Sequence, residues 1–173
     1  HPMVKTRKPA AERKAQIVDE AMRLTALLGP DRLTTQKLAD AVGITQAAVF
    51  RHFSSKVEIW QAIADRIGTE VPKHSPAFEG SSFEHLCHIV EAQFAFIVQT
   101  PSIPAILYSR ELHAENEALR RQFSEMIAQR QSLFATLFQG AVGEGALRGD
   151  LVADDAARIL LAFIQGMAMR WSM

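Results

Sequence analysis

The sequence predicts an all-α fold, in which a small N-terminal helix-turn-helix domain is followed by a larger helical domain. Apolar residues recur at helical spacing through most of the 173 residues, and a glycine joins two short helical patterns near residue 43. A stretch rich in Gly, Pro and Ser begins at residue 68, where we divide the chain into domains 10–67 and 68–173. With 48% hydrophobic residues, the chain can bury a sizeable core.

The first expected helix covers residues 12–28. Its apolar stripe begins at Ile17 and ends at Leu28, and we expect it to cover the two short helices that follow. The helix ends at Gly29 and Pro30, because proline cannot continue the hydrogen-bond ladder.

The helix-turn-helix prediction rests on residues 34–53. The first short helix stops at Gly43, where glycine supplies the positive φ that a helix end requires. Thr45 is expected to N-cap the second short helix through its hydroxyl. The apolar residues that can meet between the two helices are Leu38, Val42, Ile44, Val49 and Phe53. A turn this short crosses the helices at a steep angle.

The other face of the second short helix suits a nucleic-acid groove. It consists of Thr45, Gln46, Ala47, Ala48, Phe50, Arg51 and His52, which are polar, cationic or small apart from Phe50. The zero net charge argues against a nucleic-acid partner, but residues 1–66 carry 11 Lys and Arg against 7 Asp and Glu, and residues 67–173 carry 8 against 12. The positive charge therefore lies where attraction to phosphate needs it.

Residues 11–67 resemble the N-terminal, homeodomain-like domain of the TetR family of bacterial transcriptional regulators. The likeness rests on residue types at fixed offsets, namely Leu33-Thr34-Thr35, Lys37-Leu38-Ala39, Gly43-Ile44, Val49-Phe50, His52-Phe53 and Ser55-Lys56. Beyond residue 67 the likeness is only architectural. The resemblance implies a dimer that represses transcription on double-stranded operator DNA and is released by a small apolar or amphipathic effector.

The same resemblance implies DNA contacts at Thr35, Gln36, Thr45, Gln46, Ala47, Ala48, Phe50, Arg51, His52 and Lys56. Gln46 is the side chain among the leading residues that can make a bidentate contact to adenine. Phe50 departs from the tyrosine usual in the family and loses a phosphate hydrogen bond, so we interpret it mainly as a packing residue. The basic residues 5–9 either lie along the DNA or serve as solubilising charge.

In the second half, the helical pattern predicts helices over residues 57–67, 83–99, 103–113, 114–142 and 154–171. Residues 68–82 are expected to form a loop, and glycines at 140, 143, 145 and 149 a turn. The last two helices are apolar on more than one side, which predicts a homodimer through a four-helix interface. Alternatively, the helix 103–113 shields one of these sides.

Candidate residues for an effector pocket are Gln93, Phe94, Ile97, Tyr108, Arg110, Phe123, Ile127, Phe163 and Met167, and the alternative is that they fill an ordinary core. A cavity of several hundred Å³ would favour an effector, whereas a solid core would favour control by a protein partner.

A helical-bundle enzyme is a third hypothesis, but the chain lacks sequence motifs of nucleophilic, phosphate-binding or zinc catalysis. No enzyme activity and no cofactor are predicted.

No metal site is predicted either, because His85, Cys87 and His88 lack a fourth ligand.

The single cysteine and the absence of an apolar run of about 18 residues predict a cytoplasmic protein that does not enter the membrane. We interpret His1 and Pro2 as a vector remnant. The last helix reaches Met173 without a capping signal, which leaves open whether the chain continues past it.

Overall fold

The computed structural model describes residues 9–73 and 78–172. Its elements are α1 (Ala10–Leu28), the short 3-10 helix η1 (Pro30–Arg32), α2 (Thr35–Val42), α3 (Gln46–His52), α4 (Lys56–Lys73), α5 (Ser82–Gln99), α6 (Ser102–Leu107), α7 (Arg110–Glu115), α8 (Glu117–Gly143) and α9 (Ala153–Trp171). Every regular element in the described residues is helical, which confirms the predicted all-α fold. Of the basic residues 5–9, all except Pro9 lie outside the described part.

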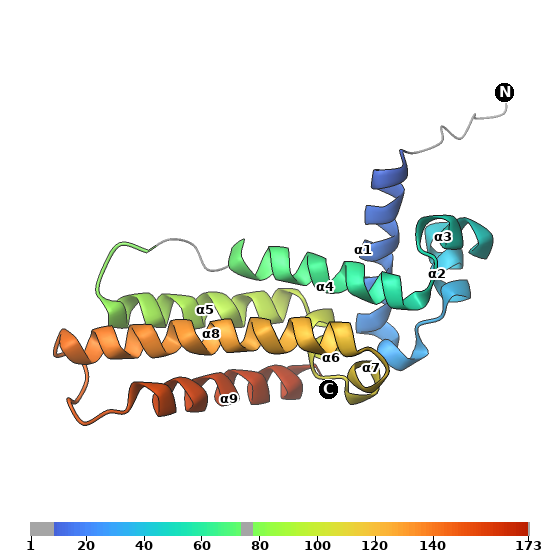
Figure 1. Cartoon of the computed structure of the whole chain (residues 1–173). Coiled ribbons are helices and arrows are strands. Elements are labelled where there is room, and N and C mark those ends of the chain that lie inside the picture. The colour runs from blue at the N-terminus through green and yellow to red at the C-terminus, as the bar shows by residue number, and fades with distance from the viewer. Residues whose placement is uncertain (1–8, 74–77, 173) are drawn as a thin grey trace.

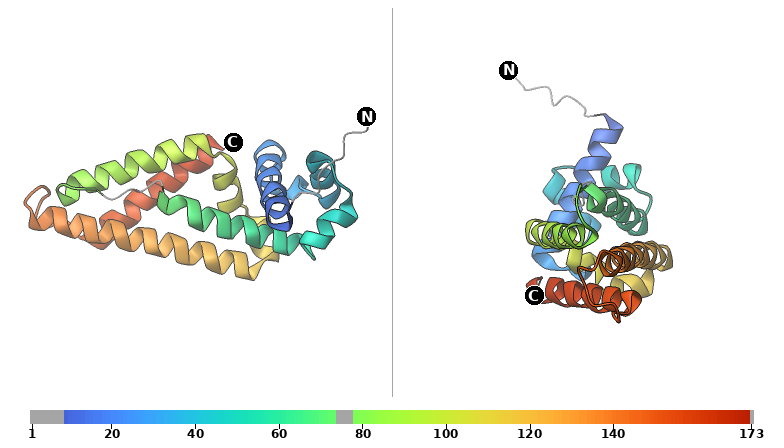
Figure 2. Two further views of the ribbon diagram at one scale, coloured as in Figure 1. Left: turned by 90° about the horizontal axis from the view of Figure 1, so that it is seen from above. Right: turned by 90° about the vertical axis from the view of Figure 1, so that its left-hand side faces the viewer.

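The molecule is elongated, with the short helices at one end (Figure 1). Helices α4, α5, α8 and α9 run lengthwise beside one another, and α1 crosses the end of this group with α2 and α3 on its far side (Figures 1 and 2). We call residues 10–53 the head and helices α5 to α9 the bundle. Helix α4 lies against both, so it connects the head to the bundle.

The predicted helix-turn-helix is present in the head as α2, a tight turn and α3. Gly43 has a φ of 72°, the left-handed conformation expected of a glycine at a helix end. The Thr45 hydroxyl accepts a hydrogen bond from the Ala48 N–H at 3.1 Å, which confirms the predicted cap. Val49 of α3 is fully buried against the other head helices.

The loop predicted from residue 68 is wrong, because α4 continues through Gly68 to Lys73. A glycine inside a helix costs about 1 kcal/mol relative to alanine. Ile67 beside it is fully buried, and Val71 packs against the same core. Burial of these two side chains offsets the unfavourable helix propensity of the glycine.

The single helix predicted over residues 103–113 is also wrong, since the structure has two short helices with a break at Tyr108 and Ser109. The Ser109 hydroxyl accepts from the Leu112 N–H at 3.2 Å and thereby starts a new helix. Asn116 does the same for α8, with its Oδ1 atom 3.2 Å from the Leu119 nitrogen, so α8 begins at residue 117 and not at 114. Both side chains compete with continuation of the preceding helix.

The glycine-rich turn begins later than predicted, because α8 runs past Gly140 to residue 143. Gly140 lies against the start of α5, where a Cβ atom would come within 2.2 Å of the Ser82 Oγ atom. The Ser82 hydroxyl donates to a Glu144 carboxylate oxygen at 2.7 Å, and the Ser82 N–H donates to the same carboxylate. These contacts fasten α5 to α8 at the end of the bundle farthest from the head (Figure 1).

Two apolar clusters fill the interior. The first joins the head to the near half of the bundle and includes Ile17, Leu38, Val49, Ile63, Ile67, Phe96, Ile106, Leu119 and Phe123. The second lies within the bundle and includes Ile89, Ile97, Phe134, Leu137, Ala157 and Ile164. The first cluster therefore crosses the predicted domain boundary. Among the described residues, no helix combines the length and apolarity needed to cross a membrane.

We expect Gly140→Ala to lower the free energy of unfolding by about 1–3 kcal/mol, because the added methyl group meets both Ser82 atoms that lie under 3.0 Å away. The matched control is Gly143→Ala, three residues later, where a Cβ atom meets nothing within 4 Å. That change should leave stability unchanged or raise it by up to about 1 kcal/mol. Urea unfolding of both variants measures the difference, and equal effects would contradict the close approach of α5 and α8.

Candidate functional site

The outer surface of α3 is the first candidate site. Thr45, Ala47 and Arg51 are exposed, and the ring of Phe50 is 44% exposed, whereas Val49 on the opposite side is buried. Phe50, interpreted from the sequence mainly as a packing residue, thus lies on the outer face. α3 therefore presents a short cationic surface with one aromatic ring at its centre.

A hydrogen bond joins the N-terminal ends of α2 and α3. The Gln46 amide nitrogen donates to the Thr35 hydroxyl oxygen at 2.6 Å, and both side chains are half-buried. Gln36, the neighbour of Thr35, donates instead to Asp40 of its own helix at 2.8 Å. In the unbound protein Gln46 is thus held in place by a residue of the other helix.

The start of α4 carries Lys56 beside the last turn of α3. The Ser54 N–H donates to the Glu58 carboxylate at 2.7 Å, and the Ser55 hydroxyl accepts from the Glu58 N–H at 3.3 Å. Hydrogen bonds from the Ser54 side chain and backbone hold the pKa of Glu58 below its ordinary value. Lys56 and His52 are both half-buried.

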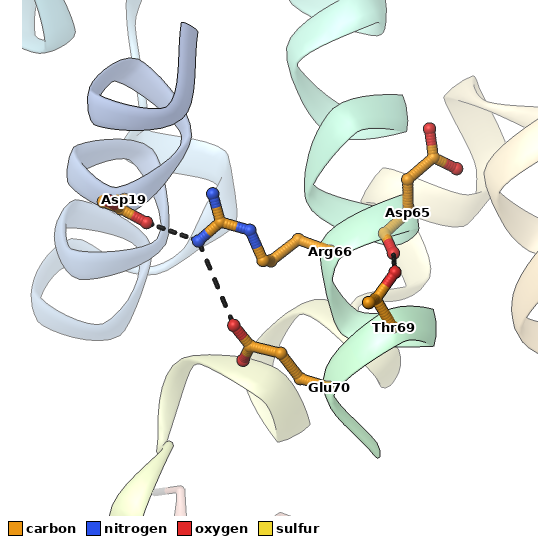
Figure 3. Close-up of polar contacts among 5 residues, drawn as sticks. All are labelled: Asp19, Asp65, Arg66, Thr69 and Glu70. Carbon is orange, nitrogen blue, oxygen red and sulfur yellow. Dashed lines mark hydrogen bonds and ion pairs between the residues drawn. The ribbon is translucent and has the colours of Figure 1, made fainter. Parts of the chain in front are cut away.

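Polar contacts hold α4 to the head on one side. The Arg66 guanidinium lies 2.5 Å from Asp19 of α1 and 4.0 Å from Glu70, one turn along α4 (Figure 3). Thr69 donates to the backbone oxygen of Asp65 at 2.9 Å. Because these groups are partly exposed, the ion pairs contribute little free energy and mainly orient α4 against α1.

The opposite side of α4 is bonded to the bundle. The Gln122 amide of α8 donates to the Asp65 carboxylate at 3.1 Å and accepts from Gln61 at 2.5 Å. Helix α4 is therefore fixed to α1 and to α8 by different residues of the same two turns, which makes it the mechanical link between the two parts.

A cavity inside the bundle is the second candidate site. It has a volume of about 60 Å³ and is lined by residues of α4, α5, α6, α8 and α9 together with Tyr108. Four of the predicted pocket residues line it, namely Gln93, Ile97, Tyr108 and Ile127. The volume is smaller than the several hundred Å³ typical of a site for a drug-sized ligand.

The other predicted pocket residues are not on this wall. Phe123 is buried in the first apolar cluster, and Arg110 is exposed at the start of α7. Phe94 packs edge-to-face on Phe163, with ring centroids 6.4 Å apart, while Phe163 and Met167 are 58% and 45% exposed.

Sequence reasoning missed several residues of the cavity, above all Val71, Arg130 and Gln165. Val71 was missed because residues 68–82 were expected to form a loop. Arg130 offered a signal, since it lies four residues after Met126 and four before Phe134, and thus on an apolar stripe of α8. A charged residue inside such a stripe marks a position where the interior is not purely apolar.

Burial changes the acidity of two groups on the cavity wall. Loss of hydration raises the pKa of Tyr108 from 10.0 to about 12. Burial also lowers the pKa of Arg130 below its ordinary value. At neutral pH the Tyr108 hydroxyl is therefore protonated, and Arg130 remains a cation because an arginine stays charged throughout the range in which proteins fold.

Helix α9 exposes a row of large apolar side chains. Ile159, Phe163 and Met167 follow one another at intervals of four residues, so they share one face of the helix, and Ile159 is 70% exposed. Met169 and Trp171 extend the exposed apolar surface toward the end of α9. A surface of this kind is typical of a protein contact.

The comparisons with known proteins concern the whole chain. The model of the bacterial regulatory proteins of the tetR family matches residues 17–63, which run from α1 into α4. The HTH-type transcriptional regulator TtgR of Pseudomonas putida is 26% identical over 175 residues, covering 96% of this chain and 83% of that protein. The HTH-type transcriptional repressor BepR of Brucella suis is 27% identical over 179 residues, covering 98% and 85%. Residues 17–63 therefore form a domain of the tetR family.

A solved structure has the same fold as this chain. A TetR-like transcriptional regulator from Rhodococcus sp. RHA1 has a TM-score of 0.79 at 19% sequence identity, covering 96% of this chain and 87% of that one. The part matched by the tetR family model contains every predicted DNA contact from Thr35 to Lys56. The cavity and the apolar row on α9 lie mostly or wholly outside it, so their roles have to be argued from their own residues.

We expect Tyr108 to ionise near pH 12 in the folded protein and near pH 10 in the unfolded protein. Tyr108 is the only tyrosine of the chain, so the absorbance of tyrosinate at alkaline pH reports this residue alone. Its raised pKa favours the folded state fully below pH 10, and this contribution is lost as the pH rises toward 12. A midpoint near pH 10 in the folded protein would show that the cavity wall is open to water.

Proposed function

We propose that this protein is a TetR-family regulator, a dimeric repressor that binds a near-palindromic operator through its two heads and is released by a small molecule in the bundle cavity. In this proposal residues 10–67 form the DNA-binding domain, and residues 68–173 bind the effector and dimerise. The observation that carries the proposal is the exposed cationic face of α3 on a head whose sequence matches the tetR family. The role requires no catalytic group.

The geometry of the head supports the proposed DNA contacts. Ala47 and Arg51 are on the exposed face that enters the major groove, with Gln46 positioned at the leading end of α3. His52 and Lys56 flank this face and contact phosphates, and so do Thr35 and Gln36 at the start of α2. Thr45, Ala48 and Phe50 complete the proposed contact surface.

Dimerisation through α8 and α9 accounts for the exposed apolar row on α9. A second copy related by a two-fold axis buries Ile159, Phe163 and Met167 against the same residues of its partner. Two heads then face one side of the dimer and reach half-sites about 34 Å apart or farther. Since the proposed target is the chromosome, we also propose that the protein acts in the cytoplasm.

Helix α4 connects the proposed effector site to the proposed DNA surface. Val71 near its C-terminal end lines the cavity, and Lys56 at its first residue belongs to the proposed DNA surface. A ligand that displaces Val71 moves α4, and the buried apolar cluster that α4 shares with α1 carries α1 with it. The spacing of the two heads in the dimer then changes, which lowers the affinity for the operator.

The DNA surface is tested with Gln46→Ala and Lys56→Ala. We expect Gln46→Ala to reduce the preference for the operator over random DNA by about 1–3 kcal/mol, because a base contact is lost. We expect Lys56→Ala to weaken binding to all DNA and to reduce the slope of log affinity against log salt by about 1. The measurement is fluorescence anisotropy, at several salt concentrations, on DNA footprinted upstream of the protein's own coding region.

Two substitutions outside the head serve as controls for these DNA measurements. Gln99→Ala on α5 and Arg110→Ala on α7 remove the same kinds of side chain from exposed positions outside the proposed DNA and dimer surfaces. Neither should alter the affinity for the operator or its salt dependence. If Gln46→Ala and Lys56→Ala cause equal losses on every DNA sequence, the assignment of Gln46 to base recognition is wrong.

The dimer is tested with Phe163→Glu. In each copy this change places a carboxylate in the proposed apolar interface, so we expect dimerisation to weaken by roughly 100-fold. Operator binding should fall with it. Sedimentation equilibrium measures the dissociation constant, with Leu27→Glu as the control, because Leu27 is an equally exposed apolar residue on α1 (67%). A dimer of unchanged strength in Phe163→Glu would exclude this face of α9.

A further inference from the structure

The hydrogen bond between Gln46 and Thr35 joins a residue proposed to read a base to a residue proposed to contact a phosphate. Thr35 is the first residue of α2, and Gln46 is the first residue of α3. The Gln46 Nε2 atom lies 2.6 Å from the Thr35 Oγ1 atom, and both side chains are half-buried. The fold of the head therefore brings these two polar groups together across the turn at Gly43.

The hydrogen bond has a defined direction, because the amide nitrogen of Gln46 can only donate. The Thr35 hydroxyl oxygen is the acceptor, so the hydroxyl proton is left for another group. Within residues 9–73 and 78–172, no group of the protein accepts this proton. The Thr35 hydroxyl can therefore donate to a phosphate oxygen, which is the contact proposed for it.

The same hydrogen bond determines which groups of Gln46 remain for the DNA. An amide carries two N–H groups and one oxygen. One N–H group is used on Thr35, so one N–H group and the Oε1 atom remain. Adenine presents the matching pair in the major groove, namely the N7 acceptor and the N6 donor. Gln46 in this orientation is therefore complementary to adenine.

The opposite orientation of the Gln46 amide would suit guanine. If Oε1 faced Thr35, the hydroxyl would have to donate to it, and both amide N–H groups would face the DNA. Two donors match the N7 and O6 acceptors of guanine. The Thr35 oxygen would then present only lone pairs to the phosphate, which repels them. A phosphate contact at Thr35 is therefore compatible only with the orientation that presents Gln46 to adenine.

We propose that Thr35 is a positioning residue for base recognition, which orients the Gln46 amide so that it selects adenine over guanine. This rests on the proposed function, since it requires that α3 enters the major groove of an operator. The phosphate contact of Thr35 and the base contact of Gln46 support each other, because each sets the direction of the hydrogen bond that they share. Specificity at this base pair thus depends on a side chain that touches no base.

The test begins by locating the base pair that Gln46 reads. The full chain and its Gln46→Ala variant are each used to select duplexes from a library with a randomised centre. We expect the wild-type chain to select adenine at one position of each half-site, where Gln46→Ala shows no preference. Selection of guanine by the wild-type chain at that position would overturn the proposal.

Thr35 is then replaced, and binding is measured on two selected duplexes that differ only in A·T or G·C at this position of one half-site. The wild-type chain should prefer A·T by about 5- to 150-fold, the range of one bidentate base contact. Thr35→Val keeps the shape of the side chain and lacks the hydroxyl, so it should bind the two duplexes about equally. Thr35→Ser keeps the hydroxyl and should retain the preference. Fluorescence anisotropy measures both affinities.

Two controls separate orientation of Gln46 from loss of affinity. Lys56→Ala removes a proposed phosphate contact, so it should weaken binding to both duplexes by the same factor and keep their ratio. Thr69→Val makes the same substitution on α4, where an exposed threonine donates to the backbone of its own helix. That change should alter neither the affinities nor their ratio.

A second measurement uses the wild-type chain and tests the proposal even if Thr35→Val does not fold, as judged by circular dichroism. Single phosphates of the half-site are replaced by neutral methylphosphonates. We expect one replacement to lower the preference for A·T over G·C, because the Thr35 hydroxyl then lacks the acceptor that sets its direction. A preference that survives every replacement would overturn the proposal.

The remaining outcomes distinguish this proposal from the proposed function. A preference that is unchanged in Thr35→Val, or lost equally in Thr35→Ser, refutes the role of the Thr35 hydroxyl and leaves operator binding intact. A wild-type chain that selects no DNA sequence refutes the proposed function, and the role of Thr35 is refuted with it.

Discussion

The whole structure depends on the burial of α4 against two neighbours at once. Ile59, Ile63 and Ile67 are almost completely buried, and they belong to the cluster that also contains Ile17 of the head and Phe123 of the bundle. Each such side chain contributes about 1.5–3 kcal/mol on burial. Apolar contacts are not directional, so they hold the helix in place without fixing its exact direction. The polar contacts of Arg66 on one side and Gln122 on the other provide that direction.

Most of the fold could be predicted from the sequence, because it follows from helical periodicity and local signals. The turn at Gly43 and the cap at Thr45 could be predicted from the sequence, since both depend on a single residue and its neighbours. Continuation of α4 through Gly68 was not, because burial in the folded protein outweighs the local preference of glycine. Ser109 and Asn116 were overlooked as caps, since either residue can equally remain inside a helix or face the solvent.

The candidate sites differ in how far the sequence reveals them. The head residues are consecutive along two short helices, so their common surface follows from spacing alone. The cavity brings together Val71, Tyr108 and Arg130, which come from distant parts of the chain, and periodicity gives no information on which distant residues meet. The hydrogen bond between Gln46 and Thr35 is likewise a tertiary feature. The side chain proposed to read a base therefore already has a hydrogen-bond partner in the unbound protein.

The close contact between Gly140 and Ser82, reinforced by the Glu144 carboxylate, fixes how closely α5 and α8 approach at the end of the bundle farthest from the head. A helix that is held at one end moves most at its other end when its middle is displaced. Helices α5 and α8 cannot separate where they are fastened, so extra volume between them is taken up toward α1. A displacement within the bundle is therefore expected at the end that lies against α1, which packs on α2 and α3.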